Sequence, residues 1–220
     1  MENLEKYVEL LEQKIYDMFQ KESSGHDIYH LRRVYNLACH LQEKEGGDRL
    51  VIGISAFLHD IHRTMEVNGK FCPPKDSLPL IYKMLRGVNF PEEKIQNVLH
   101  CIEFHEEYEF TKEGKTVSDL ETLILQDSDN LDAMGALGIG RTFSFGGSHS
   151  LPMWLPDIPL EKNYEGEHKF DPSTIHHVYS KLLQLKDNMN TKTAKDMAQA
   201  RHNFTQEFLD HFVKEWKGEI

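Results

Sequence analysis

Residues 50–58 form an almost uninterrupted apolar run, LVIGISAFL, and His59 and Asp60 follow it directly. A run this apolar is typical of a buried helix, because a surface helix would keep one polar face. An imidazole and a carboxylate at the end of a buried helix also leave water, and this costs free energy unless something binds them. The run therefore predicts a helical core with a polar site at one end, and a metal ion would suit that site.

Apolar residues recur at intervals of three and four along most of the chain, which predicts helices rather than strands. The predicted helices cover the first twenty residues, a segment that ends at the pair 46–47, residues 48–61, 77–87, a helix from about 91 that carries His100 and His105, and residues 117–133, 173–189 and 191–217. From Gly135 to Pro172 the chain is rich in glycine and proline, so we expect a long irregular loop there. The predicted class is all-α.

Size and charge narrow the class of protein further. A chain of 220 residues with 39% hydrophobic residues can bury one sizeable core, so we expect a single domain over 1–220. The net charge of −11 argues against a nucleic-acid polymer as partner, since such binding needs clustered Lys and Arg. Three cysteines without close pairing suit reduced thiols, and no apolar stretch reaches membrane-spanning length, so a cytoplasmic protein that does not bind membranes is expected. The oligomeric state stays open.

Four residues on three predicted helices are candidate metal ligands: His30, His59, Asp60 and an aspartate near 129. His30 shares a helical line with Val34 and Leu41, so it points inward. Mixed imidazole and carboxylate ligands suit a divalent ion such as Mn, Mg, Co, Ni, Fe or Zn, and the open positions can take water and a substrate oxygen. The alternative is that each residue is an ordinary hydrogen-bonded interior group, which is less plausible for all four at once.

Spacing alone leaves the aspartate undecided. Asp127 lies on one helical line with Ile124 and Leu131, whereas Asp129 lies on the neighbouring line with Leu125. Periodicity therefore allows either carboxylate to be the ligand.

The ordered set of His30, the pair His59-Asp60 and Asp129 resembles the HD-domain superfamily of metal-dependent phosphohydrolases, whose signature is H…HD…D on a helical core. The segment HLRRV from His30 is similar to that family's first-histidine helix, AFLHDI to its central motif, and DNLD from Asp129 to its closing stretch. The motif HDxxH over 26–30 and the segment 131–141 are similar to a subgroup of small, stand-alone bacterial members. The resemblance covers about residues 20–145 and is loose beyond them.

The resemblance implies an HD-domain-like helical bundle with a core over about 20–145 and a C-terminal helical extension over about 146–220. It selects Asp129 over Asp127, and it implies that His30, His59, Asp60 and Asp129 hold a divalent ion. The implied activity is hydrolysis of a small phosphorylated metabolite, with a nucleotide as the favoured substrate. Two alternatives remain open: a cyclic-nucleotide or dinucleotide phosphodiesterase with a two-metal site, and a non-catalytic regulatory protein that binds a metal or a nucleotide.

Further residues are candidates for the chemistry. Asp27 is predicted to orient a water or a ligand imidazole, with helix capping as the alternative. His105 is predicted to bind a second metal or a phosphate, as a histidine in this part of the chain does in some relatives, although it also suits a polar helix end. The general base stays unassigned, because some relatives place a Glu shortly after the His-Asp pair and this chain has IHRT over 61–64.

Three arginines are candidate phosphate clamps, since a guanidinium can grip two oxygens at once: Arg33, Arg63 and Arg141. Each also suits a surface or salt-bridged position. Arg141 precedes the segment TFSFGG, which we expect to be flexible and able to close over a ligand. Away from the site, His176 and His177 are expected on a helix surface, and Trp154 is expected to anchor the long loop.

Overall fold

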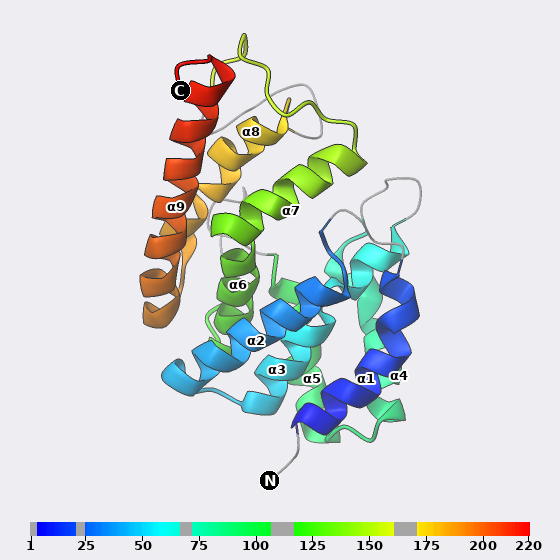
Figure 1. Cartoon of the computed structure of the whole chain (residues 1–220). Coiled ribbons are helices and arrows are strands. Elements are labelled where there is room, and N and C mark those ends of the chain that lie inside the picture. Colours follow the sequence, from blue (N-terminus) through cyan, green and yellow to red (C-terminus); the bar gives the residue numbers. More distant parts are fainter. Residues whose placement is uncertain (1–3, 21–24, 67–71, 107–116, 161–170) are drawn as a thin grey trace. The chain divides into compact units, whose positions relative to one another are not determined.

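The computed structural model describes residues 4–20, 25–66, 72–106, 117–160 and 171–220. Their regular structure is helical throughout, with no strand among them, which confirms the all-α class (Figure 1). The chain divides into two compact units, Met1–Glu22 with His26–Asp129, and Ser23–Gly25 with Asn130–Ile220. The expectation of one domain, with an extension from about 146, stays a prediction. Within the described residues no helix is both long enough and apolar enough to cross a membrane.

The first unit is built around the apolar run of the sequence. Its elements are α1 (Leu4–Phe19), α2 (Ile28–Glu45), α3 (Arg49–Leu58), η1 (His59–Met65), η2 (Pro74–Ser77), α4 (Leu78–Gly87), α5 (Glu92–Phe104) and most of α6 (Leu120–Asp132). Every residue from Leu50 to Leu58 is buried, and α3 packs against α1, α2 and α5. The predicted buried helix is therefore present, but it is shorter than expected, because the chain tightens into the 3₁₀ helix η1 at His59.

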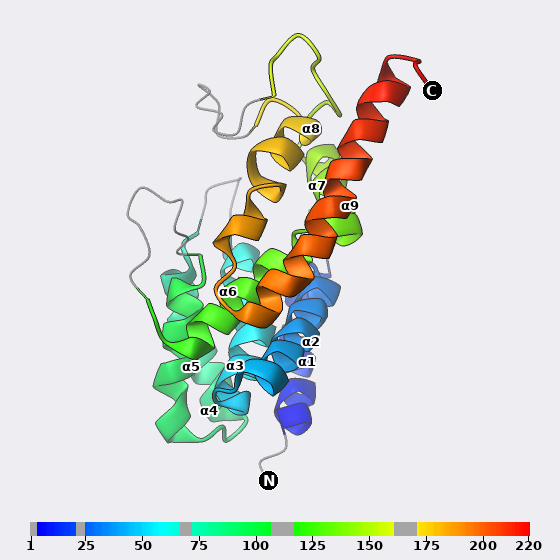
Figure 2. The same ribbon diagram turned by 90° about the vertical axis from the view of Figure 1, so that its left-hand side faces the viewer.

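The second unit contains α7 (Gly135–Ser148), α8 (Thr174–His177), the single π-helical turn η3 (Val178–Leu182), η4 (Leu185–Asn188) and α9 (Lys192–Trp216). Helices α7 and α9 pack together and lie side by side in both views (Figure 1 and Figure 2). Trp154 lies in the apolar core of this unit with Ile175 and Leu209 and is 9% exposed. It anchors its loop, as the sequence predicted.

The expectation of an irregular stretch from Gly135 onward was wrong for its first part, which is helix α7. The glycines there serve close packing. A Cβ atom at Gly138 would lie 2.2 Å from the backbone oxygen of Ala133, and one at Gly146 would lie 2.3 Å from Thr174 Oγ1. The segment TFSFGG belongs to this helix, so its expected role as a flexible cover is not supported. Residues 161–170 of the predicted loop lie outside the described residues.

The expectation that His176 lies on a helix surface was also wrong, because its side chain is 2% exposed. Its Nε2 lies 3.1 Å from the carbonyl oxygen of Ile158, and its Nδ1 lies 2.6 Å from Ser173 Oγ. A carbonyl only accepts, so Nε2 carries the proton and Nδ1 accepts from the serine hydroxyl. The histidine therefore ties the segment before α8 to that helix. Its neighbour His177 is half-buried and bonds Asp171.

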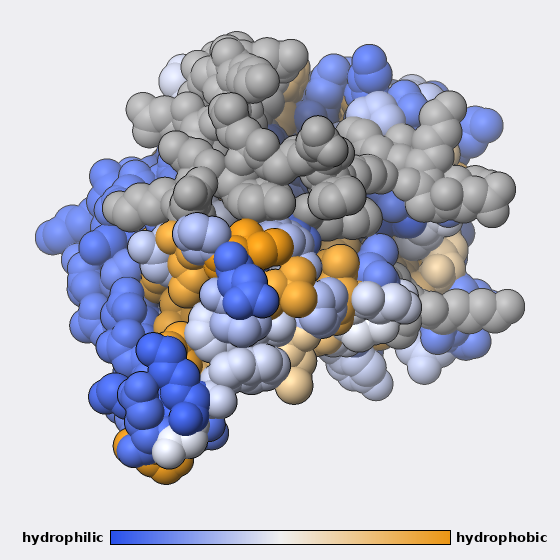
Figure 3. All heavy atoms as spheres, turned by 90° about the horizontal axis from the view of Figure 1, so that it is seen from above, coloured by the Kyte–Doolittle hydropathy of each residue, from blue (hydrophilic) through white to orange (hydrophobic). Residues whose placement is uncertain are grey.

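Some large apolar side chains remain exposed in the second unit, among them Met153 (54%) and Trp216 (45%). The space-filling view shows hydrophobic groups beside strongly hydrophilic ones on one face of the molecule (Figure 3). Apolar exposure on this scale is ordinary for a folded chain, so it defines no binding surface by itself.

Candidate metal centre

The four predicted ligands of the first unit lie in one cluster. His30 Nε2 lies 3.3 Å from Asp60 Oδ2 and 3.4 Å from Asp129 Oδ1. His59 Nε2 lies 3.6 Å and 3.8 Å from the same two oxygens. Two ligand atoms that are each about 2.1 Å from an ion lie about 3.0–3.4 Å apart at octahedral or tetrahedral angles, so these separations are near what one ion requires. The structure brings Asp129, and not Asp127, into these groups.

Local structure explains how each side chain reaches the cluster. Asp27 is the N-cap of α2 and accepts from the backbone N–H of His30 at 2.8 Å, which fixes the start of the helix and places His30 in its first turn. His59 and Asp60 follow the buried helix α3 where the chain tightens, and Asp129 lies in the last turn of α6. Asp27 therefore has the capping role that the sequence offered as its alternative, and a catalytic role for it stays a prediction.

Three histidines of the first unit hold their rings in place by a hydrogen bond from Nδ1 to a backbone carbonyl. The Nδ1 atoms of His59, His62 and His105 lie 2.9, 3.1 and 2.6 Å from the carbonyl oxygens of Ala56, His59 and Ile102, each three residues earlier in the chain. A carbonyl only accepts, so each Nδ1 carries a proton, and in His59, whose pKa is lowered to about 4, Nε2 is left as a lone-pair acceptor.

Two Nε2 atoms of this group are placed to bind a cation. His59 and His105 are 0% exposed, and their Nε2 atoms have no hydrogen-bond partner within the described parts of the chain. A buried acceptor without a donor is costly, and a divalent ion satisfies it. Hydrogen bonds from Nδ1 to a backbone carbonyl are also the usual way in which metal-binding imidazoles are oriented.

The electrostatics also suit a metal. Burial lowers the pKa of His59 to about 4, against the opposing effect of Asp60 and Asp129, so the imidazole is neutral at pH 7. Burial raises the pKa of Asp60, but His59 and His26 outweigh it and hold the pKa well below its ordinary value. Neutral imidazole and ionised carboxylate are the protonation states in which these groups bind metals.

Two further histidines extend the cluster. Three overlapping groups have ligand atoms within 4.8 Å of one another: His26, His30 and Asp60; His30, His59 and Asp129; His59, Asp60 and His105. His105 therefore lies within ligand distance of His59 and Asp60, and its role in binding a second metal or a phosphate stays a prediction. His100 lies in α5, is exposed and pairs with Asp119 at 3.1 Å. It therefore does not share a site with His105, which follows the end of that helix. His26 is an addition to the predicted residues; its signal in the sequence was the HDxxH motif over 26–30, which gave it no role.

Arg63 lies beside the cluster and is already engaged by carboxylates. Its guanidinium bonds Glu106 and lies 3.5 Å from Glu66 and 3.6 Å from Asp60 Oδ1. Burial raises the pKa of Glu106, but His62, His105 and Arg63 outweigh it and lower the pKa to about 2. This is the salt-bridged position that the sequence allowed for Arg63, and its phosphate role stays a prediction. The sequence carried no signal for the part played by His62 and Glu106.

The other two candidate clamps occupy different places. Arg141 belongs to the second unit, where it donates to the Gly25 carbonyl oxygen at 2.9 Å and to Asp132 at 3.1 Å. Its side chain is 13% exposed. Arg33 lies half-buried on α2. A phosphate role for either arginine stays a prediction, and for Arg141 it would require the ion pair with Asp132 to open.

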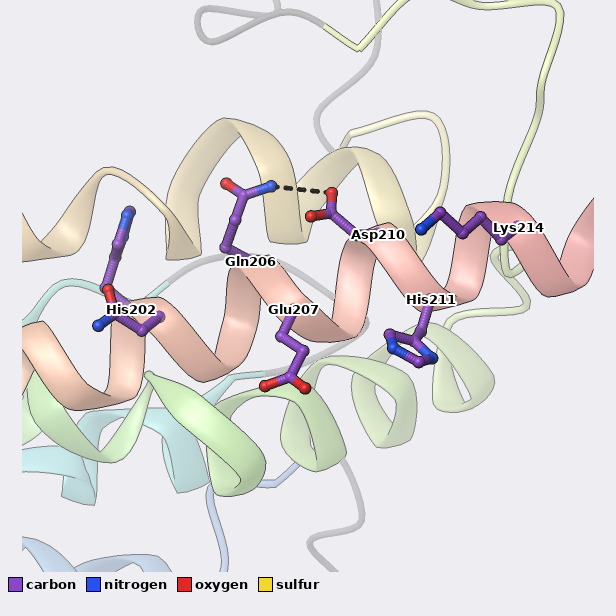
Figure 4. Close-up of a pocket in the computed structure, with 7 residues that line it drawn as sticks. His202, Gln206, Glu207, Asp210, His211 and Lys214 are labelled. Atoms are coloured by element: carbon purple, nitrogen blue, oxygen red, sulfur yellow. Dashed lines mark hydrogen bonds between the residues drawn. The ribbon is translucent and has the colours of Figure 1, made fainter. Parts of the chain in front are cut away.

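A separate surface depression of about 420 Å³ lies along α9 (Figure 4). It is lined by His202, Asn203, Gln206, Glu207, Asp210, His211 and Lys214. Gln206 and Asp210 bond each other at 3.2 Å across one turn of the helix. All the lining residues come from a single helix, and none belongs to the metal cluster, so this depression is not part of the candidate metal centre.

The fold is all-helical and contains a buried cluster of histidines and carboxylates that could hold a metal ion. The family model described as "HD domain" matches residues 27–134. The chain is also 31% identical over 214 residues to the uncharacterised protein YpgQ of Bacillus subtilis. The match covers 97% of this chain and 95% of YpgQ. The chain therefore belongs to the HD-domain superfamily, which confirms the resemblance seen in its motifs.

Solved structures agree over nearly the whole chain. An HD-superfamily hydrolase from Bacillus thuringiensis is 33% identical, with 98% of this chain and 99% of that chain covered and a TM-score of 0.73. The crystal structure of Bacillus subtilis YpgQ in complex with ADP is 28% identical, with 97% of each chain covered and a TM-score of 0.70. The similarity therefore includes the second unit, for which the sequence motifs were only loosely informative.

Proposed function

We propose that this protein is a divalent-metal-dependent phosphohydrolase whose substrate is a small phosphorylated metabolite, specifically a nucleotide. The observation that carries the proposal is the cluster of His30, His59, Asp60 and Asp129, in which the buried Nε2 of His59 has no hydrogen-bond partner within the described residues. The relative described as an HD-superfamily hydrolase supports hydrolysis, and the complex of YpgQ with ADP supports a nucleotide ligand.

In this proposal His30, His59, Asp60 and Asp129 hold the ion. When bound, the ion polarises a phosphoryl oxygen and lowers the pKa of a water molecule. The protein contributes ligands that are already oriented, because the Nδ1–H bond of His59 to the Ala56 carbonyl fixes its ring. His30 and His59 are 0% exposed, whereas the side chain of Asp129 is 19% exposed. A phosphate group therefore approaches the cluster from the side of Asp129.

A cyclic-nucleotide or dinucleotide phosphodiesterase is the second candidate, because hydrolysis of such diesters suits a two-metal site. The observation that favours it is the position of His105, whose ligand atom lies within 4.8 Å of those of His59 and Asp60. The buried His105 Nε2 has no hydrogen-bond partner in the described part of the chain, so it is able to accept a second cation.

The test is a panel of nucleoside mono-, di- and triphosphates, cyclic nucleotides and dinucleotides, incubated with Mn, Mg, Co or Ni and analysed by chromatography. His59→Ala is the site variant, and His100→Ala is the matched control, because that histidine is exposed and pairs with Asp119. Metal-dependent hydrolysis of mono-, di- or triphosphates that His59→Ala abolishes would support the proposal. Hydrolysis confined to cyclic nucleotides or dinucleotides, with two ions per chain, would favour the second candidate. Absence of hydrolysis with every metal would leave a non-catalytic regulatory protein.

A further inference from the structure

His26 makes the shortest contact to the Asp60 carboxylate. Its Nδ1 lies 2.7 Å from Asp60 Oδ2, whereas the nitrogens of His30, His59 and Arg63 lie 3.3 to 3.6 Å from the carboxylate oxygens. We propose that His26 is a positioning residue that orients Asp60 for the divalent ion. The inference rests on the proposed function, since it concerns the same metal centre.

The distance distinguishes a hydrogen bond from joint binding of an ion. Two atoms that bind one ion at about 2.1 Å lie about 3.0 Å apart even at a right angle. The 2.7 Å between His26 Nδ1 and Asp60 Oδ2 is shorter than this and is the length of a charge-assisted hydrogen bond. At pH 7 the carboxylate is ionised and only accepts, so Nδ1 donates its proton to Oδ2.

This hydrogen bond leaves Asp60 able to bind a metal. Each carboxylate oxygen has two lone pairs, so Oδ2 can accept from His26 and still face the nitrogens of His30 and His59. On the other oxygen, Arg63 Nε lies 3.6 Å from Oδ1. Contacts on both oxygens restrict rotation of the carboxylate plane, which is what holds a ligand in place before the ion arrives.

The residues on both sides of His26 have a defined backbone conformation. The next residue, Asp27, caps α2 and so fixes the start of that helix. The preceding residue, Gly25, has a φ of +99°, a conformation that favours glycine. His26 differs from His30 and His59 in being partly exposed, at 27%, but its ring meets that of His30 edge-on at 5.3 Å, so His26→Ala removes this ring contact together with the hydrogen bond.

The experiment measures Mn²⁺ binding to the full chain by electron paramagnetic resonance, so it does not depend on activity. We compare wild type, His26→Ala, His26→Asn and His26→Gln, with His100→Ala as control. The amide nitrogen of Asn lies near the Nδ1 position of histidine, whereas the amide of Gln reaches the Nε2 position. We expect His26→Ala to raise the Kd about 10- to 100-fold, and His26→Asn to recover most of that loss while His26→Gln does not. Thermal unfolding without metal checks that each variant is folded.

The outcomes separate this inference from the proposed function. If wild type binds Mn²⁺ and His26→Ala binds it equally well, the positioning role is refuted and the metal centre stands. If His26→Gln recovers binding and His26→Asn does not, His26 binds the ion through Nε2, and the inference is again wrong. If wild type binds no Mn²⁺, the proposed metal centre itself fails, and the inference fails with it. Should His26→Ala not fold, the comparison of Asn with Gln still decides.

Discussion

Two glycines of α7 should respond in opposite ways to the same substitution. Gly138 and Gly140 lie two residues apart in the helix, and neither has a positive φ. A Cβ atom at Gly140 would have no atom within 4 Å outside the helix's own backbone, whereas one at Gly138 would lie 2.2 Å from the Ala133 backbone oxygen. The pair therefore isolates the effect of the close approach to the Ala133 backbone from the effect of helix propensity.

Helix propensity and overpacking together give the expected change in stability. Replacing glycine with alanine in a helix interior gains about 1 kcal/mol at either position. At Gly140 this gain stands alone, so the midpoint of thermal unfolding should rise by about 2–4 °C for a chain of this size. At Gly138 overpacking costs about 1–3 kcal/mol, and the upper end applies because the opposing atom is backbone and cannot rotate away. The net loss is about 2 kcal/mol, which lowers the midpoint by about 4–8 °C.

The assay is thermal unfolding followed by far-ultraviolet circular dichroism, with urea unfolding as a second measure. Gly140→Ala is the matched control for Gly138→Ala, because both change the same helix by one methyl group. A Gly138→Ala protein as stable as Gly140→Ala would show that the close approach to Ala133 does not constrain this position, and the explanation of the glycine-rich helix would be wrong.

Three other predictions concern the first unit. Asp48→Ala should lower the free energy of unfolding by about 1 kcal/mol at pH 7, because Asp48 caps α3. Burial raises the pKa of Asp48, but hydrogen bonds from Lys94 and the backbone outweigh burial and hold the pKa below its ordinary value. That contribution is present above the unfolded-state pKa and is lost as pH falls through the folded-state pKa, so in urea unfolding the difference between variant and wild type should shrink as the pH is lowered below the unfolded-state value of 3.8, and a constant difference would contradict it. Burial raises the pKa of Cys101 to about 12, so iodoacetamide at pH 8 should leave it unmodified in folded protein, as mass spectrometry of peptides would show; labelling as fast as that of Cys72 would refute this. Mn²⁺ at a hundred times its Kd should stabilise wild type by about 2.7 kcal/mol and leave the thermal midpoint of His59→Ala unchanged; an equal shift in both would place the ion elsewhere.

Much of the fold could be predicted from local sequence, because helix formation depends on neighbours three and four residues apart. The apolar run before His59 predicted a buried helix, and α3 is buried over its whole apolar length. Helix α7 was missed for a physical reason. Glycine lowers helix propensity, and the close approach of Gly146 to Thr174, 28 residues later in the chain, is a contact that no local pattern contains.

The candidate site also has a part that the sequence could predict and a part that packing decides. The order of His30, the His-Asp pair and Asp129 is a property of the sequence, and it was enough to name four residues that the fold then brings together. Asp127 and Asp129 lie about 200° apart around a helix, so periodicity could not choose between them, whereas packing decides which one faces the imidazoles.

The sequence by itself determined the helical class and was enough to name candidate ligands, because both depend on residue type and on order along the chain. Only the tertiary structure decided which imidazole nitrogen faces the site, that Arg63 is held by carboxylates, and that His26 bonds Asp60. These features depend on contacts between residues distant in sequence and on backbone carbonyls placed by the fold. Hydrogen bonds form only within a few tenths of an ångström of their ideal length, a precision that residue order alone does not encode.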